Sequence, residues 1–156
     1  FFGSFGKRGL GYQVPALKRQ LREILGLNRR YRVVVVGAGK IGSALVQYGG
    51  FRARGFDLVA IYDDDPKKIG KQWDALVVRD VTHLEKDLQH HPADIAAVVT
   101  PAESAQPVAD RLVRCGVTAI LNFAPAQLQV PDHVTVKTVN LVLELEALSY
   151  ILGSRE

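Results

Sequence analysis

The fold is decided by residues 32–42, which read RVVVVGAGKIG. Four consecutive valines predict a strand buried on both faces, because short β-branched apolar runs are typical of parallel sheets. Three glycines follow at positions 37, 39 and 42, in the spacing Gly-x-Gly-x-x-Gly. The residues after the second glycine have a helical pattern. Glycines in this spacing are informative when, as here, they connect a strand to a helix.

Each glycine has a separate role in such a turn. Gly37 permits the tight turn, Gly39 lets the backbone approach a pyrophosphate, and Gly42 lets the helix pack close to the sheet. Free N–H groups at the helix N-terminus would bind the phosphates. We therefore predict a dinucleotide-binding turn made of Gly37, Ala38, Gly39, Lys40, Ile41 and Gly42.

An acidic residue follows the next predicted strand, in the stretch AIYDDDP. Asp63 lies where a carboxylate accepts hydrogen bonds from the adenosine ribose and repels a 2′-phosphate, which favours NAD(H) over NADP(H). Asp65 precedes a proline and is expected to cap a short helical turn. The alternative is that all three aspartates form only a helix start and a solvated turn.

Strands and helices alternate along the rest of the chain, which predicts an α/β fold with a doubly wound parallel Rossmann sheet. A basic linker and helix are expected at 1–30, the nucleotide-binding domain at 31–138, and a separate C-terminal helix at 139–156. The predicted strands are 32–36, 56–62, 75–78, 95–99, 117–121 and 134–139, and the predicted helices are 14–27, 41–48, 82–90, 104–115 and 141–152.

Ligands of such sheets lie at the carboxyl ends of the strands. Thr100 and Pro101 follow one predicted strand, and Asn122 and Phe123 follow the next. We expect these four residues to line the nicotinamide half of the site. The alternative is that they are ordinary turn residues.

The composition is that of a globular protein, with 47% hydrophobic and 23% charged residues. No apolar run is long enough to span a membrane, no secretory signal is present, and the one cysteine, Cys115, fits a reducing, cytoplasmic setting. None of the four histidines is predicted at the carboxyl end of a strand, and metal-ligand spacing is absent. The sheet leaves no room for a substrate domain, so catalysis is not predicted.

Both ends of the chain have unusual compositions. Residues 1–32 contain eight Lys and Arg against one Glu, whereas the remainder has twelve basic and fifteen acidic residues. This asymmetry favours proximity to a polyanion such as nucleic acid, although a solvated helix face would explain it too. The chain has no methionine and starts with Phe1, so we expect it to be a fragment that lacks its true N-terminus.

The last predicted helix, in NLVLELEALSYILG, is apolar around nearly its whole circumference. Such a helix must be buried. We expect burial in a second subunit, by exchange or by bundle packing. The alternative is that the helix covers its own sheet.

Taken together, these motifs resemble the Rex family of bacterial redox-sensing transcriptional repressors. The resemblance covers essentially the whole chain, through FFGSFGKRGLGY, VVGAGKIGSALVQYGGF, IYDDDPKKIG, TPAESAQPVADRLV, GVTAILNFAPAQLQVPDHVTV and VNLVLELEALSYIL. It implies a winged-helix DNA-binding domain before residue 1, a homodimer with exchanged C-terminal helices, and NAD(H) as a regulatory ligand. NADH binding would close the dimer and release operator DNA.

The resemblance also assigns roles to residues. The turn 37–42 would hold the pyrophosphate, Asp63 the adenine ribose, and Thr100, Pro101, Asn122 and Phe123 the nicotinamide end. Tyr48 matches a tyrosine that helps to distinguish the redox states. The family often has an aspartate where this chain has Asn140, which puts an ionic form of the switch in doubt; Asn140 is also a good helix cap.

Two other functions compete with the sensor hypothesis. A small NAD-dependent oxidoreductase would need a catalytic acid–base that the sequence does not offer. A CoA-binding domain would share the topology, but CoA carries a 3′-phosphate, for which Asp63 is a poor neighbour.

Overall fold

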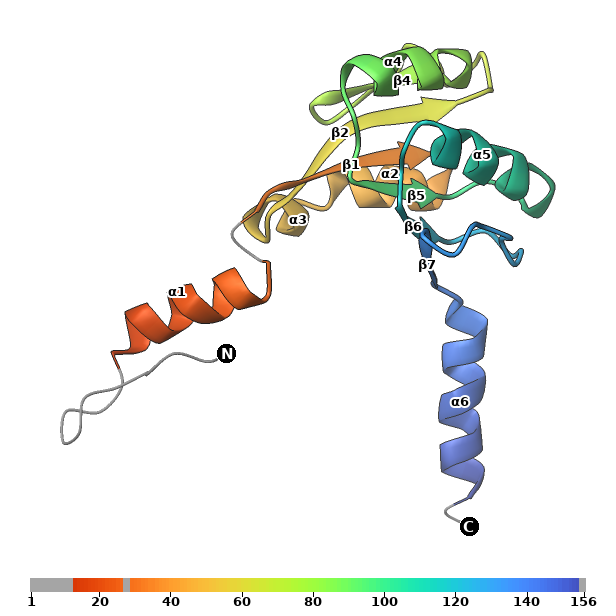
Figure 1. Ribbon diagram of the computed structural model, residues 1–156. Helices are drawn as coiled ribbons and strands as arrows, with labels where there is room; N and C mark the ends of the chain where they lie inside the picture. Colours follow the sequence, from red (N-terminus) through yellow and green to blue (C-terminus); the bar gives the residue numbers. More distant parts are fainter. Residues whose placement is uncertain (1–12, 27–28, 155–156) are drawn as a thin grey trace.

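The computed structural model describes residues 13–26 and 29–154, and its body is a seven-stranded sheet (Figure 1). The strand order is β3-β4-β2-β1-β5-β6-β7, and every neighbouring pair is parallel except β3 and β4. The strands are β1 (Tyr31–Val36), β2 (Phe56–Asp63), β3 (Gln72–Trp73), β4 (Leu76–Asp80), β5 (Ile95–Val98), β6 (Ala119–Asn122) and β7 (Thr135–Thr138).

This strand order confirms the predicted doubly wound sheet. The chain runs from the central strand β1 outwards to β2 and β4, and then crosses back to add β5, β6 and β7 on the other side of β1. β1 and β5 are therefore adjacent and parallel, but the chain that follows β1 leads to one side of the sheet and the chain that follows β5 leads to the other. This divergence opens a crevice at the carboxyl ends of the two strands.

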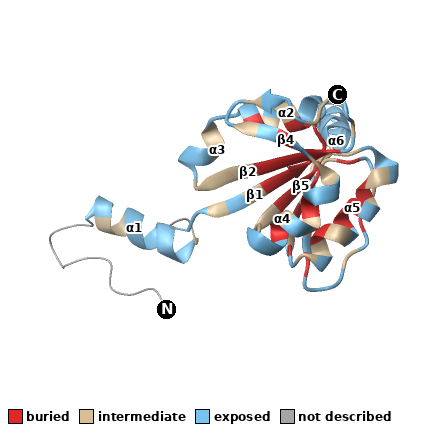
Figure 2. Ribbon diagram, turned by 90° about the horizontal axis from the view of Figure 1, so that it is seen from above, coloured by how far each residue is buried: buried red, intermediate tan, exposed pale blue. Residues whose placement is uncertain are grey.

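Helices cover both faces of the sheet, which explains the valine run. Val34 and Val36 pack in one apolar cluster with residues of α4 and α5, whereas Val35 packs in a second cluster on the side of α2. Buried residues lie along β1, β2 and β5 (Figure 2). The helices of the body are α2 (Lys40–Gln47), α3 (Gly50–Ala53), the 3₁₀ turn η1 (Val81–His83), α4 (Leu84–His90) and α5 (Ala102–Arg114).

Two terminal helices project away from this body (Figure 1). They are α1 (Val14–Ile24) and α6 (Leu141–Gly153), and neither contains a buried residue. On α6 seven large apolar side chains and a tyrosine are exposed, so this helix does not cover its own sheet. Within the described residues, no helix is long and apolar enough to cross a bilayer.

Several element boundaries differ from the sequence predictions. The helix predicted to start at Thr82 instead begins as the 3₁₀ turn η1, capped by Asp80, whose carboxylate accepts a hydrogen bond from the Thr82 N–H at 2.8 Å. The first helix ends at Ile24 rather than at residue 27. The short elements α3 and β3 were not predicted. The helical turn expected after Asp65 is present as a single turn, in which the Asp65 carboxylate accepts from the Lys67 N–H at 2.9 Å and the Asp65 carbonyl accepts from the Ile69 N–H at 3.1 Å.

The basic N-terminal segment also differs in part from its interpretation as a polyanion-facing surface. Arg30 forms a bidentate pair with Asp57, at 2.5 and 2.7 Å, and Arg29 pairs with Asp94 at 2.6 Å. The Arg32 side chain donates to the Pro92 carbonyl at 2.9 Å. These three arginines therefore bind the surface of the body.

Candidate dinucleotide-binding site

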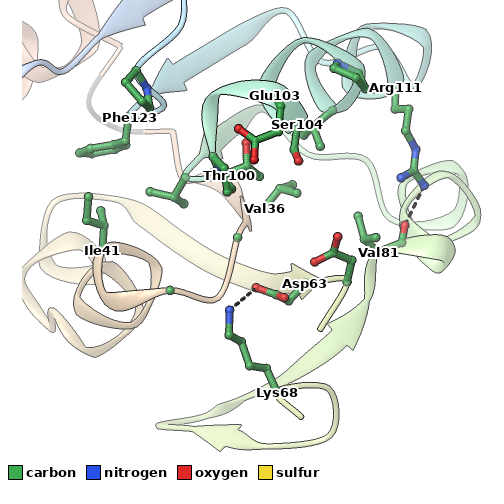
Figure 3. Close-up of a pocket in the computed structure, with 18 residues that line it drawn as sticks. Val36, Ile41, Asp63, Lys68, Val81, Thr100, Glu103, Ser104, Arg111 and Phe123 are labelled. Atoms are coloured by element: carbon green, nitrogen blue, oxygen red, sulfur yellow. Dashed lines mark hydrogen bonds and ion pairs between the residues drawn. The ribbon is translucent and has the colours of Figure 1, made fainter. Parts of the chain in front are cut away.

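A cavity of about 770 Å³ lies at the carboxyl ends of β1, β2, β5 and β6 (Figure 3). This volume is within the range of small-molecule sites. Ile41 and Phe123 lie at one end of the cavity, and Val81 and Arg111 lie at the other. The glycine turn between β1 and α2 forms part of its wall, so the cavity is elongated along the crevice that the strand order predicts.

The glycines of the turn are required for different reasons. Gly37 has φ 114°, and a Cβ there would lie 2.5 Å from the Val99 carbonyl oxygen, because β5 passes close to the turn. A Cβ on Gly42 would overlap the Gly37 carbonyl oxygen. A Cβ on Gly39 would meet no atom within 4 Å, although Gly39 lines the cavity. The space beside Gly39 is therefore open to a ligand.

Asp63 ends β2, and its carboxylate accepts hydrogen bonds from two backbone N–H groups and one lysine side chain. Its Oδ2 accepts hydrogen bonds from the Ala38 N–H at 2.6 Å and from Lys68 Nζ at 3.3 Å, and its Oδ1 accepts from the Asp65 N–H at 2.8 Å. Burial alone would raise the pKa of Asp63, but the hydrogen bonds from Asp65 and Ala38 and the charge of Lys68 outweigh it, so this pKa is lowered. The carboxylate is thus charged and fixes the glycine turn against β2.

A buried hydroxyl points to a ligand on the opposite wall. Thr100 Oγ1 is inaccessible to solvent and has no hydrogen-bond partner within the described structure. Thr100 also lines the cavity. A buried hydroxyl without a partner is costly. Because protein atoms cover Oγ1, a polar ligand atom relieves that cost only if the Thr100 side chain turns towards the cavity.

Asn122 has a structural role rather than a place in the cavity wall. Its side chain is fully buried, with Nδ2 donating to the Ala126 carbonyl at 2.8 Å and Oδ1 accepting from the Ala124 N–H at 3.0 Å. These bonds shape the loop that presents Phe123 and Pro125 to the cavity.

Two predicted switch residues lie outside the cavity lining. Tyr48 is 59% exposed and contacts Phe51 edge-on, with ring centroids 4.8 Å apart. Asn140 caps α6, because its Oδ1 accepts from the N–H groups of Val142 and Leu143 at 3.1 and 3.3 Å. The capping interpretation of Asn140 is confirmed.

The structure brings together about half of the predicted ligand residues. Those that line the cavity are Gly37, Gly39, Ile41, Asp63, Thr100, Pro101 and Phe123. The others, namely Ala38, Lys40, Gly42, Tyr48 and Asn122, do not line it. Ala38 and Gly42 still act on the site, through the Asp63 bond and the shape of the turn.

Sequence reasoning missed the far end of the cavity. Ser104, Pro107, Val108 and Arg111 follow one another at helical spacing on α5 and line this end. Arg111 is held there by Glu85, at 2.5 and 2.6 Å, and by the Val81 carbonyl at 2.7 Å. The helical periodicity from Thr100 onwards was the available signal, because a helix after a strand end points one face at the crevice.

The residues present fit a dinucleotide. The open space at Gly39 and the helix N-terminus behind it suit a pyrophosphate, and the acid at the end of β2 suits a ribose. Among the described residues, no group of three or more His, Cys, Asp or Glu is placed to hold a metal ion.

The chain is similar in sequence and in structure to known proteins of one family. The family model described as "CoA binding domain" matches residues 28–126. A redox-sensing transcriptional repressor Rex from Carboxydothermus hydrogenoformans is 47% identical over 96% of this chain and 72% of its own length. The crystal structure of RSP in complex with β-NAD⁺ and operator DNA is 40% identical, with a TM-score of 0.90 over 99% of this chain and 71% of that chain. The complex of RSP with β-NADH gives 39% identity and a TM-score of 0.84 over 93% and 70% of the two chains.

Proposed function

The chain belongs to the Rex family of redox-sensing transcriptional repressors and, through residues 28–126, to the CoA-binding domain family, and we propose on this basis that its cavity binds NADH and NAD⁺ as a signal that controls operator binding. The observation that carries the proposal is the open space at Gly39, in a cavity that Asp63 and Thr100 also line. The RSP complexes with β-NAD⁺ and β-NADH support it.

We propose that the dinucleotide lies along the cavity with its adenine at one end and its nicotinamide at the other. The pyrophosphate binds the turn 37–42, the adenosine ribose binds at Asp63, and the adenine lies towards Val81 and Arg111. The nicotinamide then lies at the Phe123 end, beside Ile41 and Pro101. The elongated cavity and the placement of the acid on one side of the turn support this orientation.

We propose that the nucleotide acts as a signal and not as a co-substrate. A dehydrogenase needs a titratable group beside the nicotinamide. Around the Phe123 end the lining residues Ile41, Thr100, Pro101, Phe123 and Pro125 have no titratable side chain, and the carboxylate nearest to them is that of Glu103, beside Thr100 (Figure 3). No histidine, lysine, tyrosine or cysteine of the described lining lies at this end.

CoA is the second candidate because of the domain family. Its adenosine carries a 3′-phosphate, which would lie near Asp63 and Asp64 at the ribose end of the cavity. Repulsion between the phosphate and these carboxylates disfavours CoA, so we expect NADH to bind in preference.

The active unit is proposed to be a homodimer that pairs or exchanges α6. A helix with this many exposed leucines is stable in water only when a partner covers it. Tyr48 and Asn140 are proposed to form the switch that transmits the redox state, Asn140 from the start of that helix. A repressor of this kind acts on DNA in the cytoplasm.

The domain organisation follows from these assignments. Residues 31–138 form the nucleotide-binding domain, 139–156 the dimerisation helix, and 1–30 the connection towards DNA. In the operator-bound relative, this chain covers 71% of the length, and we infer that a domain in the remainder makes the main DNA contacts. The exposed Lys18, Arg19 and Arg22 of α1 would lie near the phosphates.

The proposal is tested by calorimetric titration of the protein with NADH, NAD⁺, NADPH and CoA at one salt concentration. We expect NADH to bind more tightly than NAD⁺, NADPH to bind weakly, and CoA not to displace NADH. Equal affinities for NADH and NAD⁺ would rule out redox sensing by this chain, and displacement of NADH by CoA would favour the second candidate.

A further inference from the structure

The three consecutive aspartates after β2 have different surroundings. Asp63 is 7% exposed and binds the glycine turn. Asp65 accepts a hydrogen bond from the Lys67 N–H at 2.9 Å and so organises the following turn. Asp64 is exposed and lines the cavity. Only one of the three therefore has its carboxylate available without a structural task in the described contacts.

The capacity of Asp63 to bind a ribose is limited. A carboxylate offers about four acceptor positions. Asp63 uses three of them, for Ala38, Asp65 and Lys68. It can accept one further hydrogen bond, whereas the adenosine ribose presents two adjacent hydroxyl groups. A second acceptor is needed if both hydroxyls are to be bound.

We propose that Asp64 is this second acceptor and the main determinant against a 2′-phosphate. This inference rests on the proposed function of the cavity. Asp64 follows Asp63 directly and lines the same end of the cavity, so its carboxylate is the next acceptor along the chain. Asp63 keeps the turn in shape and takes one hydroxyl, and Asp64 takes the other.

The charge at this end of the cavity supports the role in specificity. Asp63 and Asp64 line it with negative charge, against Lys68, which pairs with Asp63, and Arg111, which pairs with Glu85. Since both cations have partners, a phosphate on the 2′ position would face an excess of carboxylates. Asp64, as the exposed member next to the ribose, contributes most of the repulsion that substitution can remove.

The test uses two ligands that lack nicotinamide, so the redox state does not enter: ADP-ribose and 2′-phospho-ADP-ribose. For Asp64→Asn we expect ADP-ribose binding to weaken about fivefold through loss of a charge-assisted hydrogen bond. Binding of the 2′-phosphate form should strengthen, so that the preference for ADP-ribose falls about tenfold or more.

The matched control is Asp74→Asn. Asp74 is exposed on the β3–β4 turn, does not line the cavity, and has φ 52°, a conformation that asparagine adopts readily. It removes the same charge and should leave the preference within about twofold, since exposed charges at a distance are screened. Thermal unfolding of both variants checks that they are folded.

The outcomes separate the two proposals. An unchanged preference in Asp64→Asn, or an equal change in Asp74→Asn, overturns the role of Asp64 while nucleotide binding by the unaltered protein still stands. If the unaltered protein binds neither ADP-ribose nor NADH, the proposed function fails, and the inference fails with it.

Discussion

Two glycines of the turn are expected to differ in their effects on stability and on ligand binding. A Cβ at position 42 would overlap the Gly37 carbonyl, whereas one at position 39 would point into open space. We expect Gly42→Ala to lower the free energy of unfolding by about 1–3 kcal/mol, as overpacked sites do. Denaturant titration measures this loss, and unchanged stability would show that the turn relaxes freely.

Gly39→Ala should have the opposite profile. Gly39 has φ −87°, which alanine tolerates, so stability should stay within about 0.5 kcal/mol, the usual range for substitutions away from packed features. The added methyl occupies space proposed for the pyrophosphate, and NADH affinity should fall at least about tenfold. Calorimetry and thermal unfolding of the same sample check both parts. An affinity like that of the unaltered protein would place the pyrophosphate elsewhere.

Asp63 links the ligand site to the stability of the turn. Removing its carboxylate leaves the buried Ala38 N–H without a partner. Asp63→Ala should therefore destabilise the protein by about 1–3 kcal/mol, the cost of an unsatisfied buried donor. Because its pKa is lowered on folding, this contribution is present at neutral pH and is lost as the pH falls through the lowered value. Urea titration at neutral pH measures the loss, and an Asp63→Ala protein as stable as the original would contradict it.

Besides their apolar packing, α5 and the η1–α4 segment are joined by one ion pair. Arg111 binds Glu85 through two hydrogen bonds, and this lowers the pKa of Glu85 to about 2. The pair contributes stability above about pH 4.5 that is lost as the pH falls towards about 2. Because Glu85 is 36% exposed, water screens the pair and the contribution is below about 1 kcal/mol.

Glu85→Gln should accordingly flatten the acid side of the stability profile. Urea unfolding at pH values from about 5 to about 2, the range in which Glu85 is protonated, measures how the free energy of unfolding changes with pH. Lys86→Gln, on the same helix, is the control, and it should leave the slope unchanged. A slope that is the same in Glu85→Gln and in the unaltered protein would mean that the pair contributes nothing.

How far the sequence predicts these elements depends on where their determinants lie. β1 was predicted within one residue, because its four valines carry the information locally, and the predicted end of the helix at residue 115 lies one residue beyond the end of α5 at Arg114. β3 has two residues and exists only through antiparallel pairing with β4, so it is too short for a periodic pattern to predict it. The 3₁₀ start at η1 was missed because two capping residues, Asp80 and Thr82, compete within three positions.

The residues of the candidate site also differ in how far the local sequence predicts them. The glycine turn and Asp63 were predicted because their chemistry is contiguous with a strand end. Arg111 was not, because its position is fixed by Glu85, 26 residues earlier in the chain, and by a carbonyl of η1. Asn122 was assigned to the ligand, but its strand end turns the side chain into the following loop. Both bonds are local, and an asparagine at a strand end suits such a turn as well as a ligand, so the sequence left the two roles open.

At the level of the whole molecule, the exposed apolar α6 is the proposed dimer interface. We expect a dimer in solution, and we expect Leu145→Glu combined with Leu148→Glu to give monomers, since each buried leucine is worth about 1.5–3 kcal/mol. Sedimentation equilibrium measures the masses. Ser149→Glu adds a charge at a position on α6 that is already polar, and it should leave the dimer largely intact. Dimers that persist in the double variant would exclude α6 as the interface.

If α6 is covered only in the proposed dimer, the stability of this protein depends on its concentration. Dilution would uncover a row of leucines on each freed chain, and the melting temperature should then rise with protein concentration, which is the mark of subunits that fold together. In a cell, the amount of the protein would therefore set its lifetime. Chains made faster than they can find partners would be exposed to chaperones and proteases, so that the supply of repressor is limited by its own association.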